Sequence, residues 1–260
     1  MSEHRARKRF GQNFLHDEGV IGRIISSINP QATDRLVEIG PGLGALTGHL
    51  LEAAGKLDVV ELDRDLIPKL MVKFDGKGEL NIHEADALKF DFRSLVNDGE
   101  QLRVIGNLPY NISTPLLFHL LETADIIQDM HVMLQKEVVD RMTASPGGRD
   151  YGRLSVMLQY RCKVERLFTV GPGAFNPAPK IDSAIARLTP YSELPFTAKS
   201  EQDLATVVGQ AFSQRRKMLR ASLKGMLSAE QIEACDIDPT RRPETLSIQE
   251  FVRLSDELSA

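Results

Sequence analysis

The sequence predicts an α/β protein with a Rossmann-like, seven-stranded and mostly parallel sheet, followed by a small C-terminal all-helical domain. Three observations predict this fold. Between Arg35 and Leu188, short β-branched runs alternate with amphipathic stretches, which is the pattern of βαβ units. A glycine-rich turn follows the first strand directly. Beyond Pro190 the strand pattern stops, and helical periodicity broken by prolines replaces it.

The elements follow from local pattern. The predicted strands are the runs Leu36–Ile39, Leu57–Leu62, Leu80–His83, Arg103–Gly106, Met130–Gln135, Val164–Val170 and Ala184–Leu188. Apolar residues at helical spacing predict helices between them over Ala45–Ala54, Asp65–Phe74, Thr114–Glu122, Lys136–Thr143 and Arg153–Arg161. Only a Gly/Pro-rich loop separates the last two strands, so we expect an antiparallel edge there.

The remaining chain predicts a second domain. Helices are expected over Glu201–Phe212, Arg215–Leu227, Ala229–Ala234 and Ile248–Leu258. The sequence therefore predicts an α/β domain over residues 1–190 and a helical domain over residues 191–260.

Composition excludes several classes of protein. With 32 Lys and Arg against 36 Asp and Glu, the net charge is −4, so bulk charge cannot hold a nucleic acid and any polyanion must be met by local patches. The two cysteines form no C-x-x-C pair, so we expect no disulfide framework and no metal site. The basic N-terminus lacks a signal-peptide core, and no run approaches the ~18 apolar residues of a membrane helix. We expect a cytoplasmic protein without membrane contact.

The strongest local signal is a glycine loop. The strand ending at Ile39 runs straight into Gly40, Gly42 and Gly44, and a helix follows. Glycine allows φ > 0 and close approach of the backbone to a ligand, so this loop predicts a nucleotide-like cofactor.

Three carboxylates distinguish between cofactors. Gly40-x-Gly42-x-x-Ala45 also satisfies the dinucleotide fingerprint, and Glu61 lies roughly 20 residues on, so the glycines alone leave NAD open. Glu38 just before the loop and Asp86 after the third strand favour S-adenosylmethionine, because clustered carboxylates suit a cation and repel a pyrophosphate. We expect Glu38 to face an ammonium-bearing tail, Glu61 the ribose hydroxyls and Asp86 the adenine amino group. The alternative is that each is an ordinary strand-end residue, and their placement at successive strands argues against it.

A second motif ends the fourth strand, where Asn107, Leu108, Pro109 and Tyr110 form the predicted catalytic turn. The Asn107 side-chain oxygen and the Leu108 carbonyl can each accept a hydrogen from an exocyclic amine such as adenine N6, while Tyr110 stacks on the base. Phe175, in a proline-rich loop, could cover the other face of the base. The alternatives are a plain β-turn and an aromatic that fills the core.

These motifs resemble the small-subunit (16S) ribosomal RNA adenine N6-dimethyltransferase family of the bacterial KsgA type. The similarity covers nearly the whole chain through the segments 7–15, 38–44, 107–115, 175–180 and 212–220. It implies a class I methyltransferase that uses S-adenosylmethionine to place two methyl groups on N6 of each of two adjacent adenosines near the 3′ end of 16S rRNA, within the small ribosomal subunit or its precursor. It also implies cofactor contacts at Asn13, Leu15, Gly40, Glu61, Asp86 and Asn107, with residues 1–34 covering the cofactor.

Two basic patches could supply phosphate contacts. One is the acid-free stretch that contains Arg215, Arg216, Lys217, Arg220 and Lys224, in which Arg216, Arg220 and Lys224 would share one face of the predicted helix. The other is Arg7, Lys8 and Arg9. The loop Ser145–Gly152 is expected to be mobile, and Arg149 or Tyr151 in it could touch RNA. The alternative is ordinary solvated charge, and the presence of two patches favours RNA.

Rival functions remain at this point. A large-subunit rRNA adenine methyltransferase of the antibiotic-resistance type shares the glycine loop and the catalytic turn, but Thr114-Pro115 and Arg215-Arg216-Lys217 favour the small-subunit family. A non-catalytic nucleic-acid-binding relative is disfavoured by intact Asn107, Tyr110 and Glu61. The sequence indicates no obligate protein partner.

Overall fold

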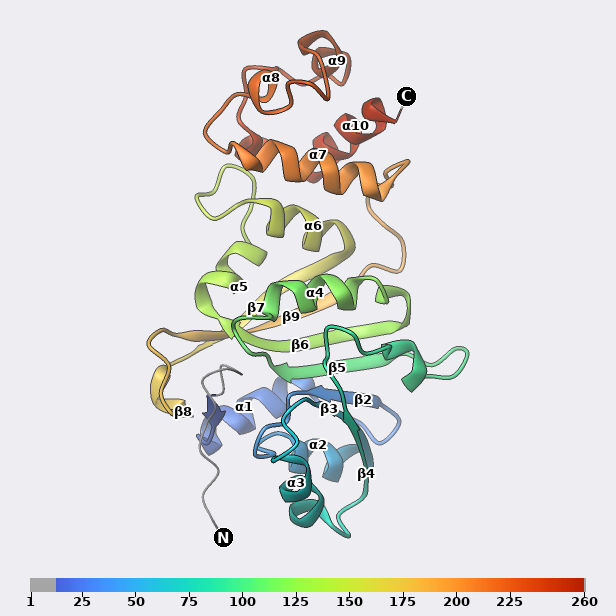
Figure 1. The fold of residues 1–260 in the computed structure, drawn as a ribbon, viewed down its shortest axis with the longest axis vertical. Helices are drawn as coiled ribbons and strands as arrows, with labels where there is room; N and C mark the ends of the chain where they lie inside the picture. The colour runs from blue at the N-terminus through green and yellow to red at the C-terminus, as the bar shows by residue number, and fades with distance from the viewer. Residues whose placement is uncertain (1–12, 260) are drawn as a thin grey trace. The chain divides into compact units, whose positions relative to one another are not determined.

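A computed structural model describes residues 13–259 of the chain (Figure 1). The chain divides into two compact units. The first contains the chain up to Val139 and Glu165–Pro190, and the second contains Asp140–Val164 and the chain from Tyr191 onward. The division therefore differs from the one expected at Pro190, because residues 140–164 group with the helical unit.

The first unit is built on a seven-stranded sheet in the order β4-β3-β2-β5-β6-β9-β7. Strands β2 to β6 are parallel, and β9 runs antiparallel to β6. All seven predicted strands are present, and the mostly parallel sheet is confirmed. Their bounds are Arg35–Ile39 (β2), Lys56–Glu61 (β3), Glu79–Glu84 (β4), Leu102–Asn107 (β5), Ile127–Gln135 (β6), Cys162–Val170 (β7) and Ser183–Pro190 (β9).

The strand order explains where a ligand can bind. The sequence of strands reverses between β2 and β5, and ligands of open α/β sheets bind outside the carboxyl ends of strands at such a switch point. Ile39 at the end of β2 is in register with Gly106 on β5, and with Val60 on β3. The glycine loop, Glu61 and Asn107 therefore leave the sheet at nearly the same level.

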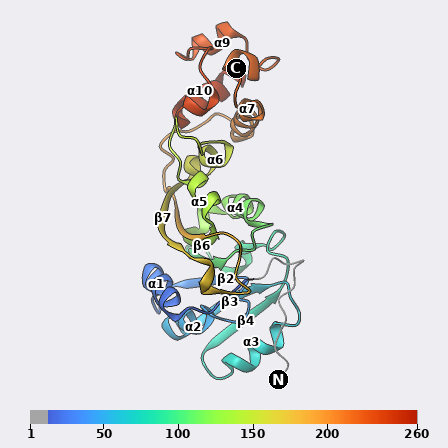
Figure 2. The same ribbon diagram turned by 90° about the vertical axis from the view of Figure 1, so that its left-hand side faces the viewer.

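Helices cover both faces of this sheet, as Figure 2 shows for α1 and α2 on one side and α4 on the other. One core cluster joins apolar side chains of α1, α2 and α3 to those of the strands, and α4 buries its own leucines. The helix bounds are Glu18–Ile28 (α1), Thr47–Ala54 (α2), Ile67–Phe74 (α3), Ser113–Leu121 (α4) and Lys136–Met142 (α5), with short 3₁₀ turns at Phe92–Leu95, Ala124–Ile126 and Pro172–Ala174. A further 3₁₀ turn, Pro243–Thr245, belongs to the second unit.

Helix α1 was not predicted, although its signals are in the sequence. Asp17 caps its N-terminus by accepting from the backbone N–H of Val20 at 2.9 Å. Ile21, Ile24 and Ile28 are buried at helical spacing. A two-residue ladder was also missed. In it β1 (Phe14–Leu15) pairs antiparallel with β8 (Phe175–Asn176), and strands this short show no periodicity to read.

The second unit has a core of its own. Its helices are α6 (Arg153–Arg161), α7 (Glu201–Ser213), α8 (Leu219–Ser222), α9 (Ala229–Ala234) and α10 (Ile248–Leu258). Tyr151, Val156 and Tyr160 lie in the same buried cluster as the apolar faces of α7 and α10. The Tyr160 hydroxyl also accepts from the backbone N–H of Ala198. These contacts explain why residues 140–164 belong to this unit.

The helix predicted over Arg215–Leu227 is wrong, because only Leu219–Ser222 is α-helical there. Met218 is extended, with φ −66° and ψ 155°. The backbone N–H groups of Leu219 and Arg220 donate to the carbonyls of Arg241 and Pro239, at 2.8 and 3.0 Å. The donors that would have continued a helix are thus used by another segment, and Arg216, Arg220 and Lys224 do not share a helical face.

No helix in the part of the chain that the structure describes has the length and apolar character to cross a membrane.

Candidate active site

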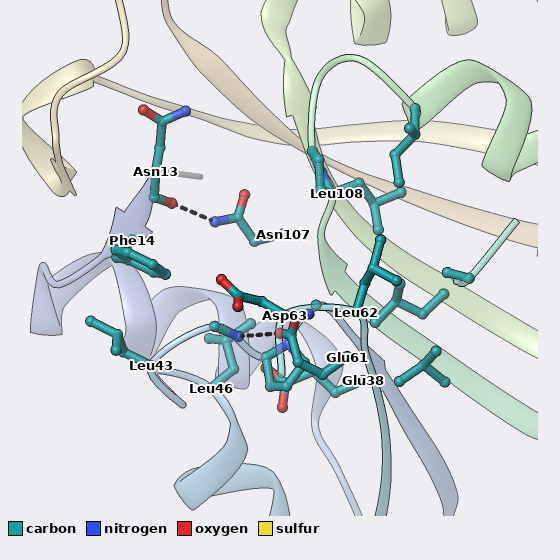
Figure 3. A pocket seen from close by; sticks show the side chains of 18 of the residues that line it. Asn13, Phe14, Glu38, Leu43, Leu46, Glu61, Leu62, Asp63, Asn107 and Leu108 are labelled. Atoms are coloured by element: carbon teal, nitrogen blue, oxygen red, sulfur yellow. Dashed lines mark hydrogen bonds between the residues drawn. The ribbon is translucent and has the colours of Figure 1, made fainter. Parts of the chain in front are cut away.

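A cavity of ≈ 340 Å³ opens where β2, β3 and β5 end (Figure 3). It is lined by five segments of the first unit, namely residues 13–15, 38–46, 60–63, 85–88 and 107–112, apart from Gly44. Four of these segments contain or directly follow the carboxyl end of a strand of the sheet, and residues 13–15 include β1 of a separate two-stranded ladder. The cavity therefore lies at the switch point that the strand order marks.

The glycine loop forms one wall, and its backbone requires glycine. Gly40, Gly42 and Gly44 have φ of 66°, 59° and 76°. A Cβ on Gly44 would lie 2.6 Å from the Phe74 ring, and one on Gly42 would lie 3.1 Å from the Phe14 ring. Gly44 does not line the cavity, so it serves the packing of the loop on α3, whereas Gly40 and Gly42 face the cavity.

Glu38 lies under this loop and is buried, with 3% exposure. Its Oε2 accepts a hydrogen bond from the Thr47 hydroxyl at 2.6 Å. Burial raises the pKa of Glu38 to about 7, the Thr47 hydrogen bond and the charge of Lys73 oppose this rise, and the nearby Glu61 adds to it. Glu38 is thus a carboxylate that a cation entering the cavity would hold in its charged form.

The other predicted carboxylates also line the cavity. Glu61 accepts from the backbone N–H groups of Asp63 at 2.7 Å and Gly42 at 3.4 Å, and burial raises its pKa. Asp86 accepts from the Leu88 N–H at 3.0 Å. Asp63, which sequence reasoning missed, is 1% exposed and accepts from the Asp65 N–H at 3.2 Å. These hydrogen bonds fix the directions of three carboxylates with backbone donors.

All the ionisable side chains among the described residues that line this cavity are acidic, apart from Tyr110. Four carboxylates line it, and among the described lining residues there is no Lys, Arg or His. Within the described part of the chain, His, Cys, Asp and Glu form no cluster of three or more that could hold a metal ion. The cavity is therefore suited to a cationic organic ligand and opposed to a pyrophosphate.

The turn Asn107–Tyr110, which the sequence predicts to be catalytic, also lines the cavity. In Figure 3 the Asn107 side chain points toward Asn13, and its Nδ2 donates to the Asn13 carbonyl at 3.1 Å. This bond directs the amide, because the nitrogen is used and Oδ1 is the atom left to accept from a ligand. Leu108 is buried, and its N–H donates to the Met133 carbonyl at 3.1 Å. The backbone of the turn is thus tied to β6.

Tyr110 lines the cavity beside Asn107, and its hydroxyl lies 2.8 Å from Oγ of buried Ser183. Phe175 is placed differently from the expectation. It is 3% exposed, belongs to the core cluster and does not line the cavity. Its pairing with Leu15 in the β1–β8 ladder accounts for this burial.

The basic residues from Arg215 to Lys224 differ in their surroundings, because Arg215 is bound within the protein and the others are exposed. The Arg215 guanidinium donates to Glu244 at 2.8 Å and to the carbonyls of Gly148 and Arg149. Arg216, Lys217, Arg220 and Lys224 are exposed. Tyr151 is fully buried, so the suggestion that it touches RNA is wrong. Arg7, Lys8 and Arg9 lie outside the described residues.

Sequence reasoning did not identify several of the residues that line the cavity. Leu43 and Leu62 are large apolar side chains left 39% and 49% exposed at the cavity. Asp63 could have been found by extending the strand-end argument two residues past Glu61. The placement of Asn13 and Leu15 could not have been found in this way, because the two-residue β1–β8 ladder holds residues 13–15 at the cavity and has no sequence pattern.

Comparison with known proteins agrees with this geometry. A family described as "Ribosomal RNA adenine dimethylase" matches residues 3–260. The chain is 62% identical over 257 residues to Ribosomal RNA small subunit methyltransferase A of Pseudomonas aeruginosa, covering 99% of this chain and 96% of that protein. It is 60% identical over 253 residues to the protein of the same name from Hahella chejuensis, covering 97% and 93%.

Two solved structures resemble the whole fold. A dimethyladenosine transferase from Plasmodium falciparum aligns with a TM-score of 0.81 at 27% identity, covering 93% of this chain and 95% of that one. The 23S rRNA methyltransferase ErmE aligns with a TM-score of 0.74 at 26% identity, covering 95% and 100%. The predicted class I methyltransferase fold is confirmed. Because the family match spans residues 3–260, including the residues that line the cavity and the basic residues between Arg215 and Lys224, the chain belongs to the ribosomal RNA adenine dimethylase family.

Proposed function

We propose that this protein uses S-adenosylmethionine to dimethylate N6 of two adjacent adenosines near the 3′ end of 16S rRNA, within the small ribosomal subunit or its precursor. The observation that carries the proposal is the orientation of Asn107. Its amide nitrogen is held by Asn13, so that its oxygen is available to an amine at the edge of an acidic cofactor cavity.

The cavity residues fit S-adenosylmethionine. A volume of ≈ 340 Å³ lies within the roughly 300–1,000 Å³ of small-molecule sites. Glu38 would face the ammonium of the methionine tail, Glu61 the ribose hydroxyls and Asp86 the adenine amino group, while Leu62 supplies an apolar face. When bound, the cofactor supplies an electrophilic methyl on a positively charged sulfur. NAD is disfavoured because four carboxylates would repel its pyrophosphate.

The catalytic turn would activate the amine by hydrogen bonding. The nitrogen lone pair of adenine N6 is delocalised into the ring, and it must localise before it can attack. In the first transfer Asn107 Oδ1 and the Leu108 carbonyl would accept the two N6 hydrogens, and in the second transfer one of them would accept the hydrogen that remains, which favours a pyramidal nitrogen each time. The methyl group that the cofactor supplies would bond to N6 as it leaves the sulfur, and water would take the N6 proton. Tyr110, held by Ser183, would stack on the base.

RNA binding is assigned to the exposed cations Arg216, Lys217, Arg220 and Lys224. Arg7, Lys8 and Arg9 are proposed as a second patch on the charge of the sequence alone. Arg215 has a different part, because Glu244 and two carbonyls occupy its guanidinium. We assign it to holding the loop around Gly148.

The second candidate is methylation of large-subunit rRNA, which the likeness to ErmE suggests. The identity of 62% to a small-subunit methyltransferase, against 26% to ErmE, favours the small subunit.

The test is to incubate the protein with labelled S-adenosylmethionine and small subunits that lack this modification, then digest the RNA and analyse it by mass spectrometry. We expect dimethyladenosine at two adjacent positions near the 3′ end. Label in large-subunit RNA instead would support the second candidate. Cofactor binding without transfer to either RNA would point to a non-catalytic binding protein.

A further inference from the structure

Lys73 on α3 is a cation beside the glycine loop that the chemistry above does not use. Its Nζ donates to the Leu43 carbonyl at 2.8 Å and to the Gly44 carbonyl at 3.4 Å. We propose that Lys73 is a positioning residue for cofactor binding, which holds the glycine loop through the Leu43 and Gly44 carbonyls and supplies positive charge on the side of the loop away from the cofactor cavity. The inference rests on the proposed use of S-adenosylmethionine.

The position of Lys73 behind the loop follows from the two neighbouring cavities. Lys73 lines a second cavity and not the cofactor cavity. Leu43 and Ala45 line both. The loop is therefore a shared wall, with the proposed cofactor on one side and the Lys73 ammonium on the other.

Two adjacent residues of α3, Lys73 and Phe74, contact the glycine loop. The Phe74 ring fills the space where Gly44 and Gly48 lack a Cβ, at 2.6 and 3.1 Å from the positions that a Cβ would take. The Lys73 ammonium lies 5.2 Å from the centre of the same ring. Phe74 thus packs against the loop while Lys73 donates to the Leu43 and Gly44 carbonyls. The hydrogen bonds to Lys73 hold these carbonyls directed away from the cofactor cavity.

Lys73 also acts on Glu38 through its charge. Three groups act on the pKa of Glu38, namely the Thr47 hydroxyl from α2, which donates to it, the Glu61 carboxylate from β3 and the Lys73 ammonium from α3. Lys73 opposes the rise in the Glu38 pKa that burial causes. Partial burial and Lys77 lower the pKa of Lys73, while Glu38 and Glu18 raise it. Without Lys73, the pKa of Glu38 would be higher. A larger fraction of Glu38 would then be neutral at a given pH, and it would attract an ammonium group less.

The experiment measures the Kd for S-adenosylmethionine by calorimetry from about pH 6 to about pH 9 for Lys73→Met, Lys73→Arg and the control Lys69→Met, an exposed lysine on the same helix. At neutral pH we expect Lys73→Met to raise Kd about three- to tenfold. The ratio of its Kd to that of the wild type should fall as pH rises and Glu38 ionises in both. Lys73→Arg should bind nearly as the wild type does, and Lys69→Met should not differ from it.

A second measurement separates charge from packing. In a Glu38→Gln background, Lys73→Met should keep only a pH-independent loss of affinity, because the titrating carboxylate is gone. Unchanged affinity of Lys73→Met at every pH would overturn the inference. A loss of equal size at every pH, unrescued by Lys73→Arg, would also overturn it, because that result indicates packing alone. If the wild type itself fails to bind S-adenosylmethionine, the proposed function fails, and that outcome is distinct from either result with Lys73.

Discussion

The proposed cofactor cavity and the basic segment Gln214–Lys224 were both predicted from short motifs, and the structure agrees with the prediction at the cavity more closely than in the basic segment. At the cavity, Gly40, Gly42, Glu38, Glu61, Asp86 and the turn from Asn107 to Tyr110 come together as expected. In the basic segment, the expected helix is mostly replaced by turns, and Arg215 is bound by Glu244.

The difference lies in what fixes each residue. The cavity residues are positioned by the ends of parallel strands, which a buried sheet places at one edge. The prediction placed the basic residues by assuming a helix. Cations at helical spacing do not by themselves stabilise a helix, because they bury no apolar face. Instead, the backbone N–H groups of Leu219 and Arg220 donate to the carbonyls of Arg241 and Pro239.

The largest effect expected is at Asn107. Asn107→Ala removes the oxygen that we propose accepts from N6, so methyl transfer should fall about 10²–10³-fold at saturating cofactor. Single-turnover transfer to small subunits measures this. Asn97→Ala is the control, because this asparagine is exposed and its side chain donates to Glu100 in a surface turn. A normal transfer rate with a normal melting curve for Asn107→Ala would remove Asn107 from the mechanism.

The second prediction concerns the backbone of the glycine loop. Gly44→Ala combines a φ of 76° with a clash against Phe74, whereas Gly55→Ala has a φ of 72° and open space. We expect about 1–2 kcal/mol of destabilisation from the backbone in both and about 1–3 kcal/mol more for Gly44→Ala. Urea unfolding measures the two free energies. Equal values would mean that the loop does not depend on its packing against α3.

The third prediction concerns Glu61. Glu61→Ala should weaken S-adenosylmethionine binding by about 1.5–3 kcal/mol, since the variant has no charged acceptor for the ribose hydroxyls. The matched control is Glu84→Ala, because Glu84 ends the next strand in register with Glu61 and does not line the cavity. Calorimetry at constant pH measures both. Equal affinities for the two variants would contradict the strand-end account of the cavity.

The smallest effects expected are in the basic segment. Replacing Arg216 and Lys217 by Gln should weaken binding to small subunits and lower the slope of log K against log salt by about one for each phosphate that is no longer neutralised. Arg215→Gln should leave that slope unchanged and instead lower the free energy of unfolding by about 0.2–1 kcal/mol, because it removes the partly exposed ion pair with Glu244. A reduced salt slope for Arg215→Gln would show that its guanidinium reaches phosphate after all.

The sequence was informative for the strands of the main sheet and for most of the amphipathic helices, although α1 was missed. The seven strands, α6 and the carboxylates at strand ends were predicted from local pattern. Residue-level reasoning did not find Asn13 and Leu15 at the cavity, because a two-residue ladder places them there and only the family resemblance implied them. It also left open whether Phe175 faces a base or the core, which tertiary packing decides.

The most direct test measures single-turnover methyl transfer at increasing concentrations of small subunits for Asn107→Ala and for the Arg216→Gln, Lys217→Gln double variant. If chemistry lies in the cavity and RNA binding in the basic segment, saturating RNA restores the double variant to the wild-type rate and does not rescue Asn107→Ala. Recovery of Asn107→Ala at high RNA concentration, or a double variant that stays slow at saturation, would contradict this separation.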